Sequence, residues 1–246
     1  AYEILRCWSS DVCSSDLLYL DHVQKNYGES AALTNVNLAI QPGKIIGLLG
    51  PNGSGKTTLI KLINGLLQPT FGTIYLKGNT PSPESKKFVF YLPDTSYLND
   101  NLKVEEALTF FQDFYEDFNI AKAYQLLNDL NINVKDSFKN LSKGNKEKVQ
   151  LILVMSRQAD LYILDEPIGG VDPAARDYIL RTIIQNRSPH SSVIISTHLI
   201  ADIEPILDEV IFINQGSILI HENAANLHQR YQQSIDEIFR YQFRLY

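Results

Sequence analysis

The chain contains 246 residues, with a formal net charge of -6 and a sequence pI near 5.4. This length suits one α/β domain with an inserted subdomain and is too short for two such domains. The acidic balance argues against a nucleic-acid binder that works by neutralising phosphates, since such domains are usually basic on one face. No run approaches the roughly 18 consecutive apolar residues of a membrane helix, so we expect any membrane role to pass through a partner.

Residues 1–17 look unlike the rest of the chain. They have neither the basic start nor the continuous apolar stretch of a secretory signal, and they lack a core-forming period. Both cysteines, Cys7 and Cys13, lie here, which gives no disulfide framework and fits a reducing cytosol. We therefore expect a non-native or disordered leader over 1–17 and a folded domain over 18–246.

The first part of the folded domain alternates apolar and polar residues. This pattern over 18–23 and 36–40, on either side of a turn at 27–30, predicts strands exposed on one face, and residues 73–76 repeat it. We expect these strands to form a small antiparallel sheet beside the main one. The apolar run 44–49 between them predicts a buried strand.

Residues 50–57, which follow this buried strand, read Gly-Pro-Asn-Gly-Ser-Gly-Lys-Thr, the G-x-x-x-x-G-K-[ST] pattern of a P-loop, and residues 58–63 continue as a helix. The glycines let the backbone bring consecutive N–H groups onto phosphate oxygens at the positive end of that helix. Lys56 is then placed to reach the β- and γ-phosphates, and the Thr57 hydroxyl to ligate Mg²⁺. The alternative is a glycine-rich turn that binds nothing. The predicted nucleotide contacts are Gly50, Pro51, Asn52, Gly53, Ser54, Gly55, Lys56, Thr57 and Thr58.

The middle of the chain changes to a helical period. Apolar residues at helical spacing run over 102–130, and aromatic members such as Phe111 and Phe114 are better explained as core than as contact surface. A further helix is predicted over 142–155, with its first residue as the N-cap. Together these segments predict a helical insert over about residues 95–158.

Short apolar runs on both sides of this insert predict buried parallel strands with a helix between the last two. The strands are expected at 88–92, 161–164 and 193–196, the helix at about 174–186, and a closing hairpin at 209–213 and 217–220. The predicted fold class is therefore α/β: a P-loop NTPase core with an antiparallel β subdomain and a helical insert.

Two carboxylates end one of the buried strands, in Leu161-Tyr-Ile-Leu-Asp-Glu-Pro167. This is the carboxyl edge, where open α/β sheets bind ligands. Asp165 is expected to hold Mg²⁺ directly or through water, and Glu166 to polarise the attacking water. The alternative is a pair that caps a following helix.

The sequence Leu141-Ser-Lys-Gly-Asn145 separates the P-loop classes, because GTPases and small-molecule kinases have no need for it. Here the chain resembles the ATP-binding subunit of ABC transporters, whose signature reads Leu-Ser-Gly-Gly-Gln and of which Leu141, Ser142 and Gly144 are kept. A Ser hydroxyl and N–H groups at a helix start form a second anion site. In the family this site faces the γ-phosphate held by the other subunit, so the resemblance implies that ATP is sandwiched between two P-loop domains.

The resemblance covers nearly everything from residue 18 to the closing hairpin and implies further roles. Tyr27 matches the aromatic residue that stacks on adenine, and His198 matches the histidine that contacts the γ-phosphate. Asp172, in the loop 169–173, matches the aspartate that couples the two sites across the dimer interface. On the residues alone, an ordinary turn tyrosine and a structural histidine are the alternatives.

The chain departs from the family at two places. Asp94 stands where the family usually has Gln, which adds a charge near the phosphates, although a carboxylate can still ligate Mg²⁺. Lys143 and Asn145 replace two signature residues, and Lys143 adds positive charge near a phosphate site. These departures indicate a functional but retuned site.

The resemblance implies an ATP-hydrolysing subunit, with ATP and Mg²⁺ as cofactors, that powers an ABC transporter through ATP-driven dimer closure. The partners would be a transmembrane permease subunit and a second ABC ATPase subunit, identical or different, with no nucleic acid. The wording of the signature resembles bacterial export-type systems, and the location would be cytoplasmic, peripheral on the inner face of the membrane. The alternatives are a nucleotide-sensing ABC-like module without sustained turnover and a cytosolic ABC ATPase acting on ribosomes or DNA.

Overall fold

The computed structural model describes residues 16–169 and 171–243, except for the side chain of residue 174. Residues 1–15 of the expected leader, with both cysteines, and Gly170 of the expected interface loop lie outside the described residues. The expected end of the leader at residue 17 is wrong, because Leu17 is 2% exposed and donates its N–H to Ile40 O at 2.9 Å. Within the described ranges, no helix is both long and apolar enough to cross a membrane.

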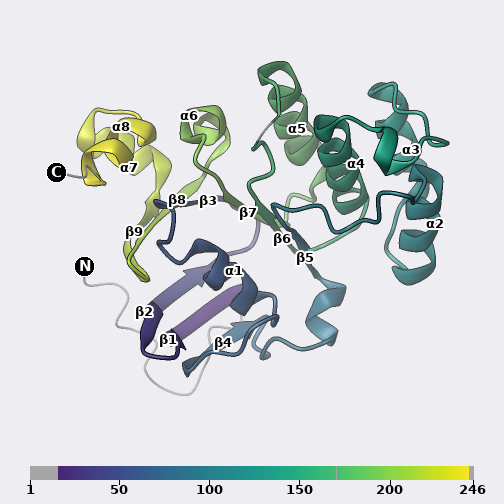
Figure 1. Cartoon of the computed structure of the whole chain (residues 1–246). Coiled ribbons are helices and arrows are strands. Elements are labelled where there is room, and N and C mark those ends of the chain that lie inside the picture. Colours follow the sequence, from purple (N-terminus) through teal and green to yellow (C-terminus); the bar gives the residue numbers. More distant parts are fainter. Residues whose placement is uncertain (1–15, 170, 244–246) are drawn as a thin grey trace.

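A three-stranded antiparallel sheet forms one side of the molecule (Figure 1). Leu18 pairs with Ile40 on one neighbouring strand and with Leu76 on the other. Leu18 and Leu20 are fully buried, because alternate residues of a strand face the same side. The antiparallel subdomain is thereby confirmed. Its strands, in spatial order, are β2 (Ser30–Ile40), β1 (Leu18–Tyr27) and β4 (Phe71–Leu76).

The main sheet has six strands in the order β5-β6-β7-β3-β8-β9. All neighbouring strands pair in parallel except β8 and β9, which form an antiparallel hairpin. Every residue of β3, β6 and β7 is buried, as the continuous apolar runs predict. The bounds are β3 (Ile45–Leu49), β5 (Val89–Leu92), β6 (Leu161–Asp165), β7 (Ser192–Ser196), β8 (Glu209–Asn214) and β9 (Ser217–Asn223).

Helix α1 (Lys56–Ile63) lies between the two sheets (Figure 1). Its four apolar side chains pack in one cluster with residues of β1, β2 and β4 on one side and of β3, β6 and β8 on the other. The loop that precedes α1 is therefore fixed relative to both sheets. The four side chains are Leu59, Ile60, Leu62 and Ile63.

Three helices of the predicted insert gather beyond strand β5, at one end of the main sheet (Figure 1). They are α2 (Val104–Phe114), α3 (Ile120–Asp129) and α4 (Lys143–Met155). Ser142 caps α4 as predicted, since its hydroxyl accepts a hydrogen bond from the Asn145 N–H at 3.2 Å. Two short 3-10 helices also lie in this part of the chain: η2 (Glu84–Lys87) precedes β5, and η3 (Phe138–Asn140) precedes α4.

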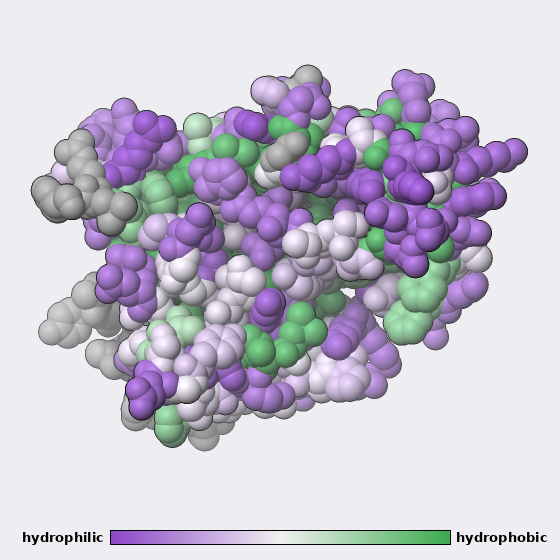
Figure 2. Space-filling model, viewed as in Figure 1, coloured by the Kyte–Doolittle hydropathy of each residue, from purple (hydrophilic) through white to green (hydrophobic). Residues whose placement is uncertain are grey.

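The prediction of a core role for the aromatic residues of α2 is only half right. Phe111 is buried at 3% exposure, but Phe114 is 68% exposed and stacks on Phe110, which is 58% exposed. The buried positions of α2 follow a helical period that ends at Phe111, and Phe114 in the last turn points away from the core. Figure 2 shows a hydrophobic area at the lower end of α2, on an otherwise mostly hydrophilic insert.

Four helices follow strand β6 in the chain: α5 (Pro173–Asn186), α6 (Ile200–Ile203), α7 (Ala224–Tyr231) and α8 (Ile235–Gln242). The sequence pattern predicts only the first of them. The other three are at most eight residues long, too short for a helical period to stand out. Two of these helices do carry a local sequence signal for their first residue: Asn223 caps α7, and Ser234 with Glu237 forms a capping box on α8.

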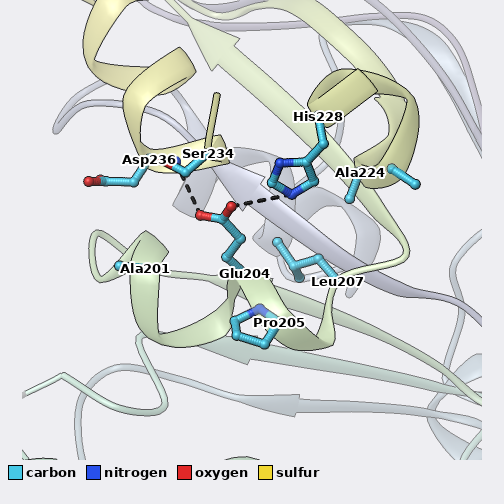
Figure 3. Close-up of a pocket in the computed structure, with 9 residues that line it drawn as sticks. Ala201, Glu204, Pro205, Leu207, Ala224, His228, Ser234 and Asp236 are labelled. Atoms are coloured by element: carbon cyan, nitrogen blue, oxygen red, sulfur yellow. Dashed lines mark hydrogen bonds and ion pairs between the residues drawn. The ribbon is translucent and has the colours of Figure 1, made fainter. Parts of the chain in front are cut away.

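The Glu204 carboxylate contacts both C-terminal helices. Glu204, in the 3-10 helix η4 (Glu204–Ile206), lies 3.3 Å from His228 Nε2 and accepts a hydrogen bond from the Asp236 N–H at 3.4 Å (Figure 3). It also accepts from the Ile235 N–H at 2.9 Å. Its side chain therefore contacts α7 and the start of α8 at once, on the wall of a cavity of about 500 Å³. Of the residues lining this cavity, none belongs to the predicted nucleotide site.

Candidate nucleotide site

The P-loop connects β3 to α1 with glycines in conformations that other residues rarely adopt. Gly53 and Gly55 have φ of +78° and +109°. A Cβ on Gly55 would lie 2.8 Å from Ala32 O, and a Cβ on Gly50 would lie 2.3 Å from Ile213 O. Gly55 is the N-cap of α1 and supplies no side-chain cap, so the first N–H groups of the helix remain available to an anion.

A glycine that the sequence reasoning missed supports the P-loop from outside. Gly216, in the β8–β9 turn, donates its N–H to Ser54 O at 2.9 Å and accepts from the Thr34 N–H at 2.8 Å. A Cβ at this position would lie 2.6 Å from Ala32 O. The turn at 214–216 was predicted, but its contact with the P-loop joins distant parts of the chain and has no local signal.

Gly216→Ala should therefore lower the free energy of unfolding and weaken nucleotide binding. Gly216 has φ of +77°, a conformation that costs an L-residue about 1–2 kcal/mol, and the Cβ collision adds to this cost. Gly78→Ala is the matched control, since Gly78 also has φ of +77° but nothing within 4 Å of an added Cβ. Urea unfolding of both variants measures the difference, and equal losses would contradict the proposed support.

Lys56 folds back over its own loop. Its ammonium group donates hydrogen bonds to Gly50 O at 2.7 Å and Pro51 O at 3.0 Å. Burial lowers the pKa of Lys56, and the nearby charges of Glu166 and Asp165 act in the opposite direction. The group is thus a half-buried cation beside two carboxylates, at the mouth of the loop.

Asp165 ends strand β6 with only 5% of its surface exposed. Burial raises its pKa, and the charges of Glu166 and Asp94 add to the rise, whereas the charge of Lys56 acts in the opposite direction. The Thr57 hydroxyl donates to Asp165 Oδ2 at 3.5 Å. The predicted pair of Thr57 and Asp165 is therefore brought together from two distant parts of the chain.

This oxygen pair fits a magnesium ion that travels with a nucleotide. Mg²⁺ is usually held by one or two protein oxygens, with phosphates and waters completing its octahedron. Among the described residues, no group of three or more His, Cys, Asp or Glu side chains is arranged to hold a metal alone. A hydroxyl and a buried carboxylate suit an ion that takes its other ligands from the nucleotide.

Glu166 is held by the end of strand β7. Its N–H donates to Ser196 O at 2.8 Å, and its Oε2 accepts from Thr197 Oγ1 at 3.0 Å and lies 3.0 Å from His198 Nδ1. Its φ of +51° is in the left-handed region, which costs energy and is concentrated at functional sites. The structure brings the predicted Glu166 and His198 together and adds Thr197, which the sequence reasoning did not single out.

Asp94 follows strand β5 and is exposed. Burial, together with the charges of Asp165 and Asp94, raises the pKa of Tyr91 to about 12. Asp94 also contributes to the raised pKa of Asp165, so its charge acts on the carboxylate beside the P-loop. The residue that departs from the family pattern thus belongs electrostatically to the same site.

The other predicted site residues make their contacts within their own elements. Asp172 caps α5 by accepting from the Ala175 N–H at 3.0 Å, and Ser142 caps α4. Tyr27, at the end of β1, is 50% exposed, with Lys25 Nζ 5.4 Å from its ring centroid. A Cβ on Gly144 would meet open space. These residues lie at the surface, where a second molecule can reach them.

The parallel sheet, the P-loop at its carboxyl edge and the carboxylate strand beside it define a P-loop nucleoside-triphosphate-binding domain. A family model described as ABC transporter matches residues 33–169. The chain belongs to the ABC transporter family, as an ATP-binding subunit.

Individual relatives agree with this assignment. The chain is 30% identical to the ABC-type transporter ATP-binding protein EcsA of Bacillus subtilis (strain 168), over 87% of this chain and 90% of EcsA. It is 28% identical to the lantibiotic transport ATP-binding protein SrtF of Streptococcus pyogenes, over 89% of this chain and 97% of SrtF.

Solved structures extend the agreement to the fold. An ATP-binding subunit of an ABC transporter superposes with a TM-score of 0.83 at 25% identity, and the superposition covers 93% of this chain and 100% of that chain. A nucleotide-free ATP-binding cassette from an ABC transporter superposes with a TM-score of 0.74 at 20% identity, covering 89% of this chain and 96% of the other. The predicted fold class is thereby confirmed.

Proposed function

We propose that the chain hydrolyses ATP and powers an ABC transporter through ATP-driven closure of a dimer. The observation that carries this proposal is the braced Glu166 carboxylate, which accepts from Thr197 Oγ1 and lies 3.0 Å from His198 Nδ1. Phosphoryl transfer to water depends mainly on positioning and electrostatics. A fixed carboxylate next to a phosphate-binding loop meets that requirement.

The triphosphate is proposed to bind along the P-loop. The glycines leave room for it and turn the N–H groups of residues 50–58 toward its oxygens, at the N-terminus of α1. Lys56 exchanges its contacts with Gly50 O and Pro51 O for the β- and γ-phosphates. Tyr27 stacks on the adenine ring, which its exposed position at the end of β1 allows.

Thr57, Asp165 and Asp94 are the proposed magnesium ligands, with Asp165 acting directly or through water. Mg²⁺, when bound, neutralises charge on the β- and γ-phosphates. Asp165 is suited to this role because burial raises its pKa and so destabilises its anionic form. A bound cation would stabilise that form.

Glu166 is proposed to orient the attacking water and to accept its proton as the water oxygen bonds to the γ-phosphorus and the bond to ADP breaks. His198 is proposed to donate a hydrogen bond to the γ-phosphate. Its side chain is 67% exposed, so an incoming phosphate can reach it, while its Nδ1 contact with Glu166 orients the ring.

Ser142 and Gly144 of a second copy are proposed to close over the γ-phosphate, and Asp172 to couple the two sites across the interface. The exposed Ser142 cap and the open space around Gly144 support this role. A single chain supplies only half of each composite site, so the isolated protein is expected to be a weak ATPase. ATP binding closes the dimer and hydrolysis reopens it.

The partner is proposed to be a transmembrane permease that docks on the helical insert, which places the chain at the inner face of the membrane. The second ATPase copy is identical or a related subunit. Export is the proposed direction, because similar proteins include SrtF, named for lantibiotic transport, and a Nod factor export ATP-binding protein of Cupriavidus metallidurans, 29% identical over 81% of this chain and 69% of that protein.

A nucleotide-sensing module without turnover is the second candidate, favoured by the extra negative charge of Asp94. Steady-state ATP hydrolysis by the chain with its permease distinguishes the transporter ATPase from the sensor, because a sensor would bind ATP without sustained phosphate release.

The same hydrolysis assay tests the role of Asp94. Asp94→Gln should raise the Mg²⁺ concentration for half-maximal rate severalfold, since a neutral amide is a weaker ligand for a hard cation than a carboxylate. An unchanged rate and unchanged metal dependence would remove the proposed role of Asp94.

A further inference from the structure

A polar cavity of about 510 Å³ lies away from the nucleotide site. Its walls come from the segments that follow α4 and α5 and from those that lead into β6 and β7. These are the amino ends of the parallel strands, whereas the P-loop and Asp165 lie at their carboxyl ends. The cavity is therefore on the opposite edge of the main sheet, and no predicted site residue lines it.

Lys122, on α3, provides a cation on the cavity wall. Its Nζ donates hydrogen bonds to Met155 O at 2.6 Å and Asn186 O at 2.9 Å, the last residues of α4 and α5. In the described part of the chain, no carboxylate oxygen forms an ion pair with it, and burial lowers its pKa. An ammonium has three donors, so one remains after these two carbonyl contacts.

Arg187 provides a second cation without a carboxylate partner among the residues described. Its Nη1 donates to Ser191 O at 2.8 Å and more weakly to Gly43 O at 3.4 Å, and its buried Nε has no hydrogen-bond partner there. Ser156, on the same wall, is 1% exposed, and its hydroxyl also has no hydrogen-bond partner among the described residues. Buried polar groups are nearly always paired, so donors left over at a cavity indicate a ligand or an ion.

The remaining charges on the cavity wall are already compensated. Arg157 is almost fully buried and pairs with Asp117 at 2.8 Å, and Asp160 forms an ion pair with Lys77. Among the described residues, the cavity thus retains two cations without carboxylate partners and a hydroxyl without a hydrogen-bond partner. This arrangement matches a dianion with several acceptor oxygens.

We propose that this cavity binds a phosphate group, held by Lys122, Arg187 and Ser156. Phosphate offers two negative charges and several acceptor oxygens, and Lys and Arg are the side chains that recognise it most often. The cavity volume falls in the range of small-molecule sites, about 300–1,000 Å³, so a phosphate carried on a small organic body also fits. The site is independent of ATP hydrolysis at the opposite edge.

Titration calorimetry of the full chain with inorganic phosphate, and separately with glycerol 3-phosphate, tests the proposal at constant ionic strength. Hydrogen exchange in the same samples locates the site, because protection is expected in segments 156–160 and 186–191. Binding of inorganic phosphate as tight as that of the ester identifies free phosphate as the ligand. Tighter binding of the ester identifies a phosphorylated small molecule.

Variants decide whether the named donors are responsible. Lys122→Gln and Arg187→Gln should each weaken binding about tenfold or more, since each removes a charged hydrogen bond. Ser156→Ala should weaken it about two- to tenfold while preserving the fold, because the hydroxyl it removes has no hydrogen-bond partner among the described residues. Lys135→Gln is the control, removing one exposed positive charge from the same insert without touching the cavity.

Ser156→Ala keeps the test decisive if Lys122→Gln unfolds, because Lys122 also joins the ends of two helices. The proposal is overturned if neither probe binds, if protection appears only in the P-loop at 50–58, or if Lys135→Gln weakens binding as much as the cavity variants do. Binding with the expected protection and selective loss in the three cavity variants supports it.

Discussion

Lys56→Ala should weaken ATP binding by roughly 10- to 150-fold, the effect of losing a charged hydrogen-bond donor worth about 1.5–3 kcal/mol. The lysine lies beside Asp165 and Glu166, whose charges act to raise its pKa against the effect of burial. Without its ammonium, these carboxylates would face the triphosphate with no protein cation between them, so the loss should lie toward the upper end of that range.

Equilibrium binding of ATP, measured by titration calorimetry with Mg²⁺ present, checks this expectation. Lys61→Ala is the matched control, because Lys61 is exposed and lies in the last turn of the same helix α1, whereas Lys56 begins that helix. Lys61→Ala and Lys56→Ala change the net charge by the same amount. If both variants bind ATP alike, or if Lys56→Ala binds as the unaltered chain does, the P-loop assignment of the lysine is wrong.

Glu166→Gln should keep ATP binding and lower the rate of hydrolysis by about a hundredfold to ten-thousandfold, the usual contribution of a positioned general base. The amide can still accept the hydrogen bond from Thr197 Oγ1, so the loop keeps its shape while the side chain loses the ability to take a proton. With hydrolysis blocked, the ATP-bound dimer should accumulate.

Phosphate release measures the rate, and light scattering with Mg²⁺ and ATP measures the dimer. Glu84→Gln serves as the control, since Glu84 is an exposed carboxylate whose ion pair, among the described residues, is with Lys87 and not with a predicted site residue. Normal hydrolysis by Glu166→Gln would remove its role as base. A variant that binds ATP yet stays monomeric, or pairs with Ser142 far from the γ-phosphate, would contradict dimer closure.

The parts of this molecule that could be predicted from sequence are those whose cause is local. The P-loop, the Asp165-Glu166 pair and the buried strands each carry their signal within a few neighbouring residues. The Ser142 cap is of the same kind, because capping depends on the three residues that follow it.

The parts that could not be predicted depend on approaches between distant segments. Gly216 supports Ser54 across 162 positions of the chain, which no local pattern reveals. The sheet order places β3 between β7 and β8, and only this order sets Thr57 beside Asp165. Phe114 was misassigned because helical spacing identifies a face but not where the neighbouring core ends.

Helix α6 (Ile200–Ile203) is clamped at both ends by acidic side chains. Before it, His198 contacts Glu166; after it, Glu204 holds α7 and α8. His198 and Glu204 are therefore joined by Leu199 and this single short helix. We therefore expect a displacement of α7 and α8 to shift His198, the residue proposed to contact the γ-phosphate, and a displacement of His198 to shift these two helices in turn.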